Sequence, residues 1–353
     1  MFARAPFDFD VDSGHFMTTG SVIDLPSVII TLILTAILIK GIRESAGFNS
    51  AMVILKVAIV LFVIVVGAFY IDTNNWKDFA PFGWGGVSFF GNTVWGLSAA
   101  NGAPLGMIAG AAMIFYAYIG FDSVSTHAEE AIIPQKDVPK GIIYSLLVCT
   151  VLYVLVAIVL TGMVPYNQIN IDAPVSAAFQ SIGITWANFI ISLGAIAGIT
   201  SVLLVLLLSQ PRIMLAMARD GLVPKKFFGA VHEKFKTPYK TTLLTGIFVS
   251  LLAGFIPLRV LAELVSIGTL FAFVIVCAAV LIMRRTNPSA ERPFKAPLYP
   301  VTPILGMLIC LLLMFSLPLE NWGRLFIWLA IGMVIYFGYG RKHSIMNPNN
   351  QTK

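Results

Sequence analysis

An aspartate inside an apolar stretch is the first place where this sequence could do chemistry. Residues 105–133 are apolar up to Gly120 and polar directly after it, with Asp122 at the change. Glycine relaxes the backbone, and an aspartate can cap the N–H groups of Val124 or Ser125 to start a second half-helix. Carbonyl groups freed over residues 116–119 would suit an ammonium group, and the new helix N-terminus a carboxylate. The pattern predicts a broken helix; a continuous helix with a glycine packing notch is the alternative.

A lysine in a second apolar stretch is the other unusual charge. Lys56 lies in A-M-V-I-L-K-V-A-I-V-L-F-V, six residues into a helix that starts at the cytoplasmic side. Six residues advance a helix by about 9 Å, which strains a snorkelling side chain without forbidding it. Burial favours the neutral form of lysine, so the side chain can gain and lose a proton. We expect proton coupling at Lys56, with snorkelling as the alternative.

Two hydroxyl residues, Thr200 and Ser201, extend this hypothesis. They stand in G-A-I-A-G-I-T-S, where small residues let helices approach closely. The hydroxyl groups could face an ion or an ammonium group, although packing alone explains the small residues equally well.

The elements that must position these residues are membrane-spanning helices. Hydrophobic residues make up 58% of the chain and charged residues only 11%, against about 25% charged in a soluble domain. Apolar runs long enough to cross about 30 Å of hydrocarbon recur throughout, and the alternating segments of a β-barrel do not. We predict an all-α transmembrane fold with about nine helices, near 25–42, 51–71, 105–126, 141–164, 186–210, 241–258, 261–283, 301–319 and 323–340.

The basic residues give the orientation of these helices. Eighteen of the 23 lysines and arginines fall on one side, which predicts a cytoplasmic C-terminus in the cell membrane. Nine spans then place the N-terminus outside, although residues 1–24 carry no export signal. An odd number of preceding helices, with Met1 inside an extracellular loop, would account for this. The net charge of +6 points to anionic lipid as a partner and not to nucleic acid.

Enzymatic chemistry has no visible basis here. Cys149, Cys277 and Cys310 each lie in an apolar run without metal-ligand spacing, and no hydrolase motif occurs. We expect no catalytic residues, metal or cofactor. Glu129 and Glu130 could pair with Arg212 and Arg219, or form a solvated acidic edge. A short amphipathic pattern starting at Pro174 predicts an external lid helix.

Four segments together carry a family resemblance. The stretch G-F-D-S-V-S-T-H-A-E-E-A-I-I-P-Q-K-D-V-P-K-G-I at 120–142 resembles the amino acid–polyamine–organocation permeases, specifically their cationic amino acid transporter branch. Supporting matches are L-I-K-G-I-R-E-S-A at 38–46, S-Q-P-R-I-M-L-A-M-A-R-D-G-L-V-P at 209–224 and P-F-K-A-P-L-Y-P at 293–300. The resemblance covers residues 21–340.

This resemblance implies a LeuT-type fold of twelve helices, with two inverted five-helix repeats. The nine runs would be family helices four to twelve, so about three N-terminal helices would be missing. The implied organisation is an extracellular loop at 1–24, the end of the first repeat at 25–71, an extracellular loop at 72–104, a complete second repeat at 105–283, two peripheral helices at 284–340 and a cytoplasmic tail at 341–353.

The resemblance also implies residue roles. The substrate would lie in the unwound sixth family helix, against Phe115, Tyr116, Ala117, Tyr118, Ile119 and Asp122. Lys56 would stand on the fifth family helix in lieu of a sodium ion, with Thr200 and Ser201 near that position on the eighth. The expected function is proton-coupled transport of an amino acid by alternating access. A transport-incompetent membrane fragment that binds partners or lipid is the alternative, and the oligomeric state is left open.

Overall fold

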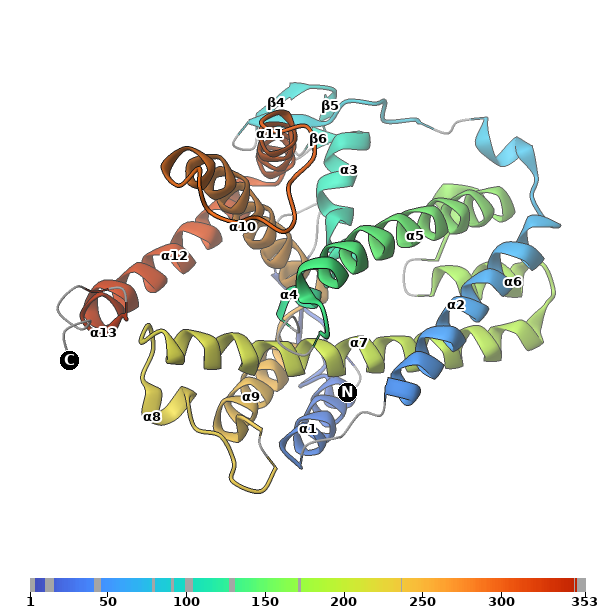
Figure 1. Cartoon of the computed structure of the whole chain (residues 1–353). Coiled ribbons are helices and arrows are strands. Elements are labelled where there is room, and N and C mark those ends of the chain that lie inside the picture. Colours follow the sequence, from blue (N-terminus) through green and yellow to red (C-terminus); the bar gives the residue numbers. More distant parts are fainter. Residues whose placement is uncertain are drawn as a thin grey trace.

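The structure is a computed structural model, and it describes residues 4–9, 16–40, 46–77, 80–89, 92–98, 104–126, 131–170, 173–235, 237–345 and 347. Helices dominate it (Figure 1). The long ones are α1 (Leu25–Lys40), α2 (Ala46–Ala68), α5 (Pro134–Met163), α7 (Thr185–Arg219), α9 (Tyr239–Phe255), α10 (Leu258–Thr286), α11 (Val301–Phe315) and α12 (Leu319–Ile335).

One predicted span is divided. It consists of α3 (Met107–Ile114), the 3-10 turn η2 (Phe115–Tyr118) and α4 (Ser123–Thr126). Shorter helices connect the spans, namely η1 (Thr73–Trp76), η4 (Tyr166–Gln168), α6 (Pro174–Ser181), α8 (Lys225–Phe228), the π-helical η5 (Tyr336–Gly340) and α13 (Arg341–His343). The strands form three hairpins: β1 (Phe7–Phe9) with β2 (Phe16–Thr18), β3 (Val87–Phe89) with β4 (Asn92–Trp95), and β5 (Leu97–Ser98) with β6 (Pro104–Leu105).

Each of the nine predicted apolar runs contains a helical segment. Within the described residues, six helical segments are long and apolar enough to cross a membrane, and α1, α9 and α11 are shorter apolar helices. Several helices exceed their predicted bounds, and α5 and α7 do so by the most residues. Helix α5 begins seven residues early, because Pro134 stands at the first helical position where proline is favoured. Helix α7 continues through Pro211 to Arg219.

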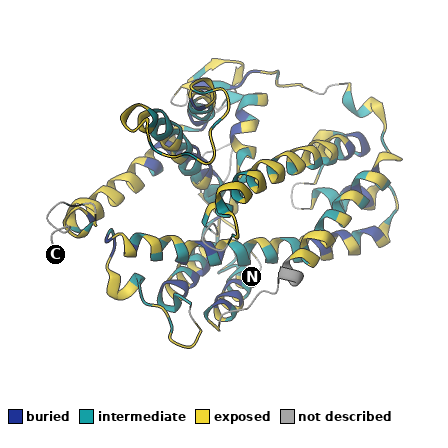
Figure 2. Ribbon diagram, in the orientation of Figure 1, coloured by how far each residue is buried: buried dark blue, intermediate teal, exposed yellow. Residues whose placement is uncertain are grey.

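The surface confirms the transmembrane class. The accessible area is 22108 Å², whereas a soluble monomer of 38.3 kDa exposes about 14,000 Å². Many exposed side chains are large and apolar: Figure 2 shows exposed residues along α5 and along the outer part of α12, where Ile327 and Val334 are 63% and 72% exposed. Exposure of so large an apolar surface to water is unfavourable, and lipid chains or further helices would cover it.

Three apolar clusters hold the helices together. The first joins α2, α5, α6 and α7 around the fully buried Phe179. The second joins α3, α10, α11 and α12 around Ile267, Leu270 and Met314. The third joins α1 and α7 through Leu34, Leu38 and Leu207, with α9 packed against it.

Helices α1 and α9 pack antiparallel and very closely. Asp24 N–H donates to Gly254 O, and at the other end Thr237 Oγ1 donates to Ile39 O. Between these ends, a Cβ on Gly246 would collide with the Thr35 side chain, and one on Gly254 would lie 2.9 Å from Val28 Cγ2. The two glycines therefore set the separation of the helices.

A buried ion pair joins α10 to α12. Glu263, 8% exposed, accepts from Arg259 Nε at 3.2 Å and from Arg324 Nη1 at 3.5 Å. Arg324 also donates to Oδ1 of the fully buried Asn321. The acid is thus neutralised within the protein, as a carboxylate near the membrane requires.

The segment that leads into β3, together with β3 itself, fixes the start of the divided helix. Ile108 N–H donates to Gly85 O, and Met107 N–H to Gly83 O. The buried Ser88 Oγ donates to Phe315 O at the end of α11. These bonds satisfy N–H groups that open the first turn of α3 and anchor it beside α11.

Candidate functional site

The divided helix is the centre of the candidate site, and its break lies where the sequence predicted it. The α-helical pattern ends at Ile114, the 3-10 turn η2 follows, and Ile119 is extended. Gly120 has φ +120°, a conformation that favours glycine. Helix resumes at Ser123. The alternative of a continuous helix with a glycine notch is therefore wrong.

The role predicted for the Asp122 side chain needs correction. Its carboxylate does not cap Val124 or Ser125; Asp122 Oδ1 accepts from Gly120 N–H at 3.2 Å. The positive φ of Gly120 turns that N–H toward the side chain two residues later. The next turn is closed by Ser125, whose N–H and Oγ both donate to the Asp122 carbonyl. Asp122 thus stabilises the break itself.

Two backbone carbonyls at the break are open. The Tyr116 carbonyl accepts from Ile119 N–H, and the Ala117 carbonyl accepts from Tyr153 Oη at 3.0 Å. Within the described part of the chain, the carbonyls of Tyr118 and Ile119 accept no hydrogen bond. Partial negative charge therefore collects where an ammonium group could bind.

Two neighbouring helices support the break. On one side, Phe273 of α10 places its ring 6.1 Å from that of Phe115 and 5.4 Å from that of Phe121, so it contacts both halves. On the other side, Tyr118 and Tyr153 of α5 meet edge to face at 5.2 Å. A cavity of about 250 Å³ lies between the break and α5, lined by Ala117 to Phe121, by Val124 and by residues of α5.

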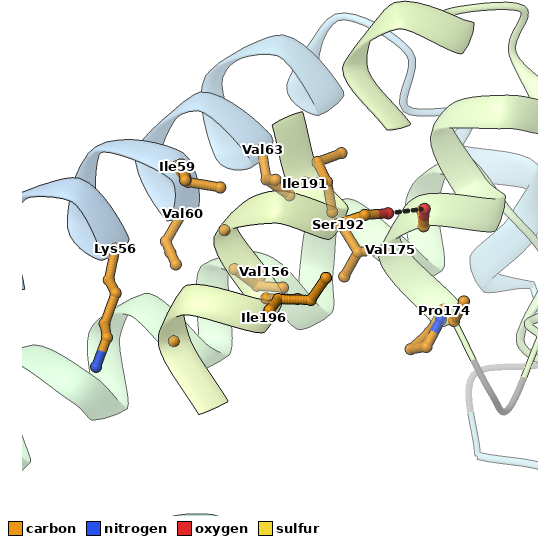
Figure 3. Close-up of a pocket in the computed structure, with 15 residues that line it drawn as sticks. Lys56, Ile59, Val60, Val63, Val156, Pro174, Val175, Ile191, Ser192 and Ile196 are labelled. Atoms are coloured by element: carbon orange, nitrogen blue, oxygen red, sulfur yellow. Dashed lines mark hydrogen bonds between the residues drawn. The ribbon is translucent and has the colours of Figure 1, made fainter. Parts of the chain in front are cut away.

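Lys56 borders a second and larger cavity of about 590 Å³, which is lined by residues of α2, α5, α6 and α7 (Figure 3). Its walls are nearly all aliphatic, with Ile59 and Val63 of α2 facing Ile191 of α7. Ser176 and Ser192 face each other at 3.4 Å across one wall. The predicted helix α6 contributes Pro174, Val175 and Ser176 to this lining.

The lysine lies against α7 with its charge unpaired. A Cβ on Gly198 would be 3.9 Å from Lys56 Cε. Among the described residues, no hydrogen bond or ion pair reaches Lys56 Nζ. Thr200 and Ser201 follow on α7 and are half-buried, but they do not line the cavity. Lys56 therefore lies against α7, the helix that carries Thr200 and Ser201, but no hydrogen bond joins its ammonium group to either hydroxyl.

One face of α5 connects the two cavities. Ser145, Cys149 and Tyr153 line the small cavity, and Val156 lines the large one. The spacings of four, four and three residues put these side chains in one stripe on the helix. Of the predicted residues, Ala117, Tyr118 and Ile119 border the small cavity and Lys56 borders the large one, and α5 is a wall of both.

Sequence reasoning missed the residues on α5 and α10. The signal for Tyr153 was present, because a tyrosine hydroxyl within an apolar span needs a partner. Phe273 and Cys149 gave no signal, since each is an ordinary residue of an apolar helix. Glu129 and Glu130 lie outside the described residues, as does any pairing of them with Arg212 or Arg219.

Comparison with known proteins identifies the family. A family model described as amino acid permease matches residues 13–337. The chain belongs to the amino acid permease family. It is 46% identical over 328 residues to the methylthioribose transporter of Bacillus subtilis, and 46% identical over 335 residues to the branched-chain amino acid permease BcaP of the same organism. These matches cover 93% and 95% of this chain and 67% and 68% of those relatives.

A more distant relative of this permease comes from a plant. The vacuolar cationic amino acid transporter 4 of Arabidopsis thaliana is 38% identical over 275 residues, which is 76% of this chain and 42% of the relative. Together with the multiple apolar helices, the permease family establishes a multi-pass membrane protein that is a transporter by family and not an enzyme.

Proposed function

We propose that this permease carries an amino acid across the cell membrane and that the substrate binds at the break between η2 and α4. The observation that carries the proposal is the pair of open carbonyls at Tyr118 and Ile119 beside a cavity. Open carbonyls suit the ammonium group, and irregular backbone within a membrane is tolerated only where it lines a cavity. Ala117 also lines this cavity, and Phe115, Tyr116 and Asp122 belong to the site as its flanking residues.

We further propose that transport is coupled to protons through Lys56. Lys56 borders a mostly aliphatic cavity and has no hydrogen-bond or ion-pair partner among the described residues. The free energy of its charged form therefore depends on how the surrounding helices pack. Protonated Lys56 would favour one packing of α2 against α7, and the neutral form would release it. Thr200 and Ser201 would join the ammonium group in that packing. The resulting motion is alternating access between two inverted repeats, with residues 105–283 as the second repeat and a cytoplasmic C-terminus.

The substrate class is open among the ligands for which the relatives are named. Those relatives are described as transporters of methylthioribose, of branched-chain amino acids and of cationic amino acids. On the strength of the motif at 120–142, we also propose that the sequence groups with the cationic amino acid transporter branch, which does not fix the charge of its own substrate.

Equilibrium binding tests the proposal directly. The chain in lipid nanodiscs is titrated with radiolabelled leucine, arginine and methylthioribose. We expect saturable binding of an amino acid that unlabelled ligand displaces. Binding of methylthioribose alone would change the substrate class. No binding of any amino acid, by a chain that elutes as a monodisperse folded protein, would support the fragment with only a lipid- or partner-binding role.

A further inference from the structure

The wall of the small cavity that α5 provides has no role in the proposal above. The cavity, about 250 Å³, lies between the break and the α5 residues Ser145, Cys149 and Tyr153. A water molecule takes about 30 Å³ of liquid, so the space equals that of about eight waters. An aliphatic side chain of four or five heavy atoms fits such a volume while the ammonium group remains at the open carbonyls.

The lining of this cavity is uncharged. Aliphatic and aromatic side chains such as Ile119 and Leu146 alternate with the hydroxyl of Ser145 and the thiol of Cys149. The acid nearest in the chain, Asp122, is exposed, does not line the cavity and accepts from Gly120 N–H. A guanidinium or ammonium side chain would find no carboxylate among the lining residues, whereas an aliphatic side chain would gain apolar contacts there.

Tyr153 holds the opposite wall in place. Its hydroxyl donates to the Ala117 carbonyl, and its ring packs on Tyr118. This bond satisfies one carbonyl of the unwound segment and leaves those of Tyr118 and Ile119 open. The position of the two open carbonyls relative to the cavity therefore depends on Tyr153.

We propose that this cavity is the subsite for an uncharged side chain of the transported amino acid, and that Tyr153 is a positioning residue for the carbonyls that bind its ammonium group. The inference rests on the proposed function and adds a substrate class to it. Leucine and its aliphatic analogues are the expected ligands, and arginine and lysine are excluded from the cavity.

Filling the cavity tests the subsite. Cys149→Phe places a ring in the cavity, and Leu147→Phe adds the same ring to the exposed face of α5 as a control. In nanodisc binding assays we expect Cys149→Phe to weaken leucine binding by about tenfold or more and alanine binding much less, because only the larger side chain needs the space. The control should bind both as the parent does. Equal affinities of Cys149→Phe and the parent for leucine would overturn the inference.

Removing the hydroxyl tests the positioning role. Tyr153→Phe keeps the ring but frees the Ala117 carbonyl, and Tyr144→Phe on the exposed face of α5 is the matched control. We expect Tyr153→Phe to weaken leucine and alanine binding by the same factor, since both share the ammonium group. A change that separates leucine from alanine, or no change, would contradict the positioning role. A purely structural role would lower the melting temperature and leave the affinity unchanged.

Thiol labelling provides a test without a bulky substitution. The chain has three cysteines, so Cys277→Ser with Cys310→Ser leaves Cys149 as the single thiol. We expect leucine to slow its alkylation by N-ethylmaleimide and arginine not to slow it. Leucine that binds without protecting Cys149 overturns the inference and leaves the proposed function intact. A chain that binds no amino acid overturns both.

Discussion

At the scale of single residues, the charge on Lys56 matters most, because it borders a cavity of about 590 Å³ with nearly all-aliphatic walls. Proton coupling and snorkelling make opposite predictions for a neutral side chain of similar length. Coupling requires a group that changes charge, whereas snorkelling only requires that the stem be accommodated.

We predict that Lys56→Met abolishes accumulation of substrate driven by a pH gradient and preserves the folded protein. Methionine keeps most of the packing of the lysine stem and cannot bind a proton. Uptake into proteoliposomes, acidic outside, is the measurement, and Lys40→Met at the end of α1 is the control. If Lys56→Met accumulates substrate as the parent does, the lysine is not the coupling group.

Gly120 supports a second residue-scale prediction. Its φ of +120° strains any other residue by roughly 1–3 kcal/mol, although a Cβ there would meet no atom within 4 Å. We therefore expect Gly120→Ala to lower the melting temperature and the leucine affinity together. Gly110→Ala is the control, since Gly110 is helical and equally unobstructed, and alanine should stabilise it by about 1 kcal/mol. If Gly120→Ala and Gly110→Ala changed the melting temperature and the leucine affinity alike, the break would not be needed for leucine binding.

At the scale of elements, the apolar runs identified the helices and the polar switch identified the break. The sequence could not specify which side chains face the break. Tyr153 and Phe273 reach it from α5 and α10, and their partners lie 36 and more than 150 positions away in the chain. The prediction that Asp122 caps Val124 or Ser125 was wrong for a local reason. With φ +120°, Gly120 directs its own N–H to the Asp122 carboxylate.

The α1–α9 contact gives the prediction that belongs to this scale. A Cβ on Gly246 would collide with Thr35, so Gly246→Ala must push two antiparallel helices apart. Overpacking of this kind costs typically 1–3 kcal/mol. We expect a lower melting temperature for Gly246→Ala and none of this loss for Gly268→Ala, where a Cβ meets no atom within 4 Å. Adding Thr35→Ala should restore part of the loss; a double variant no more stable than Gly246→Ala would contradict the contact.

At the scale of the whole molecule, the asymmetry of basic residues predicts which loops face the cytoplasm. We expect Thr18→Cys to react from outside with a membrane-impermeant maleimide and Lys226→Cys to react only after the membrane is opened, each in a cysteine-free background. Both side chains are exposed, so burial does not limit the reaction. Equal reaction of both from outside would contradict the predicted orientation.

The central claim is that an amino acid binds at the broken helix, and photo-crosslinking locates it most directly. Photo-leucine, which carries a diazirine in its side chain, is bound to the unmodified chain in nanodiscs, irradiated, and mapped by peptide mass spectrometry. We predict adducts on residues 115–122 and on the α5 stripe from Ser145 to Tyr153, both suppressed by excess leucine. Adducts confined to other helices, or adducts that leucine does not suppress, would contradict the account.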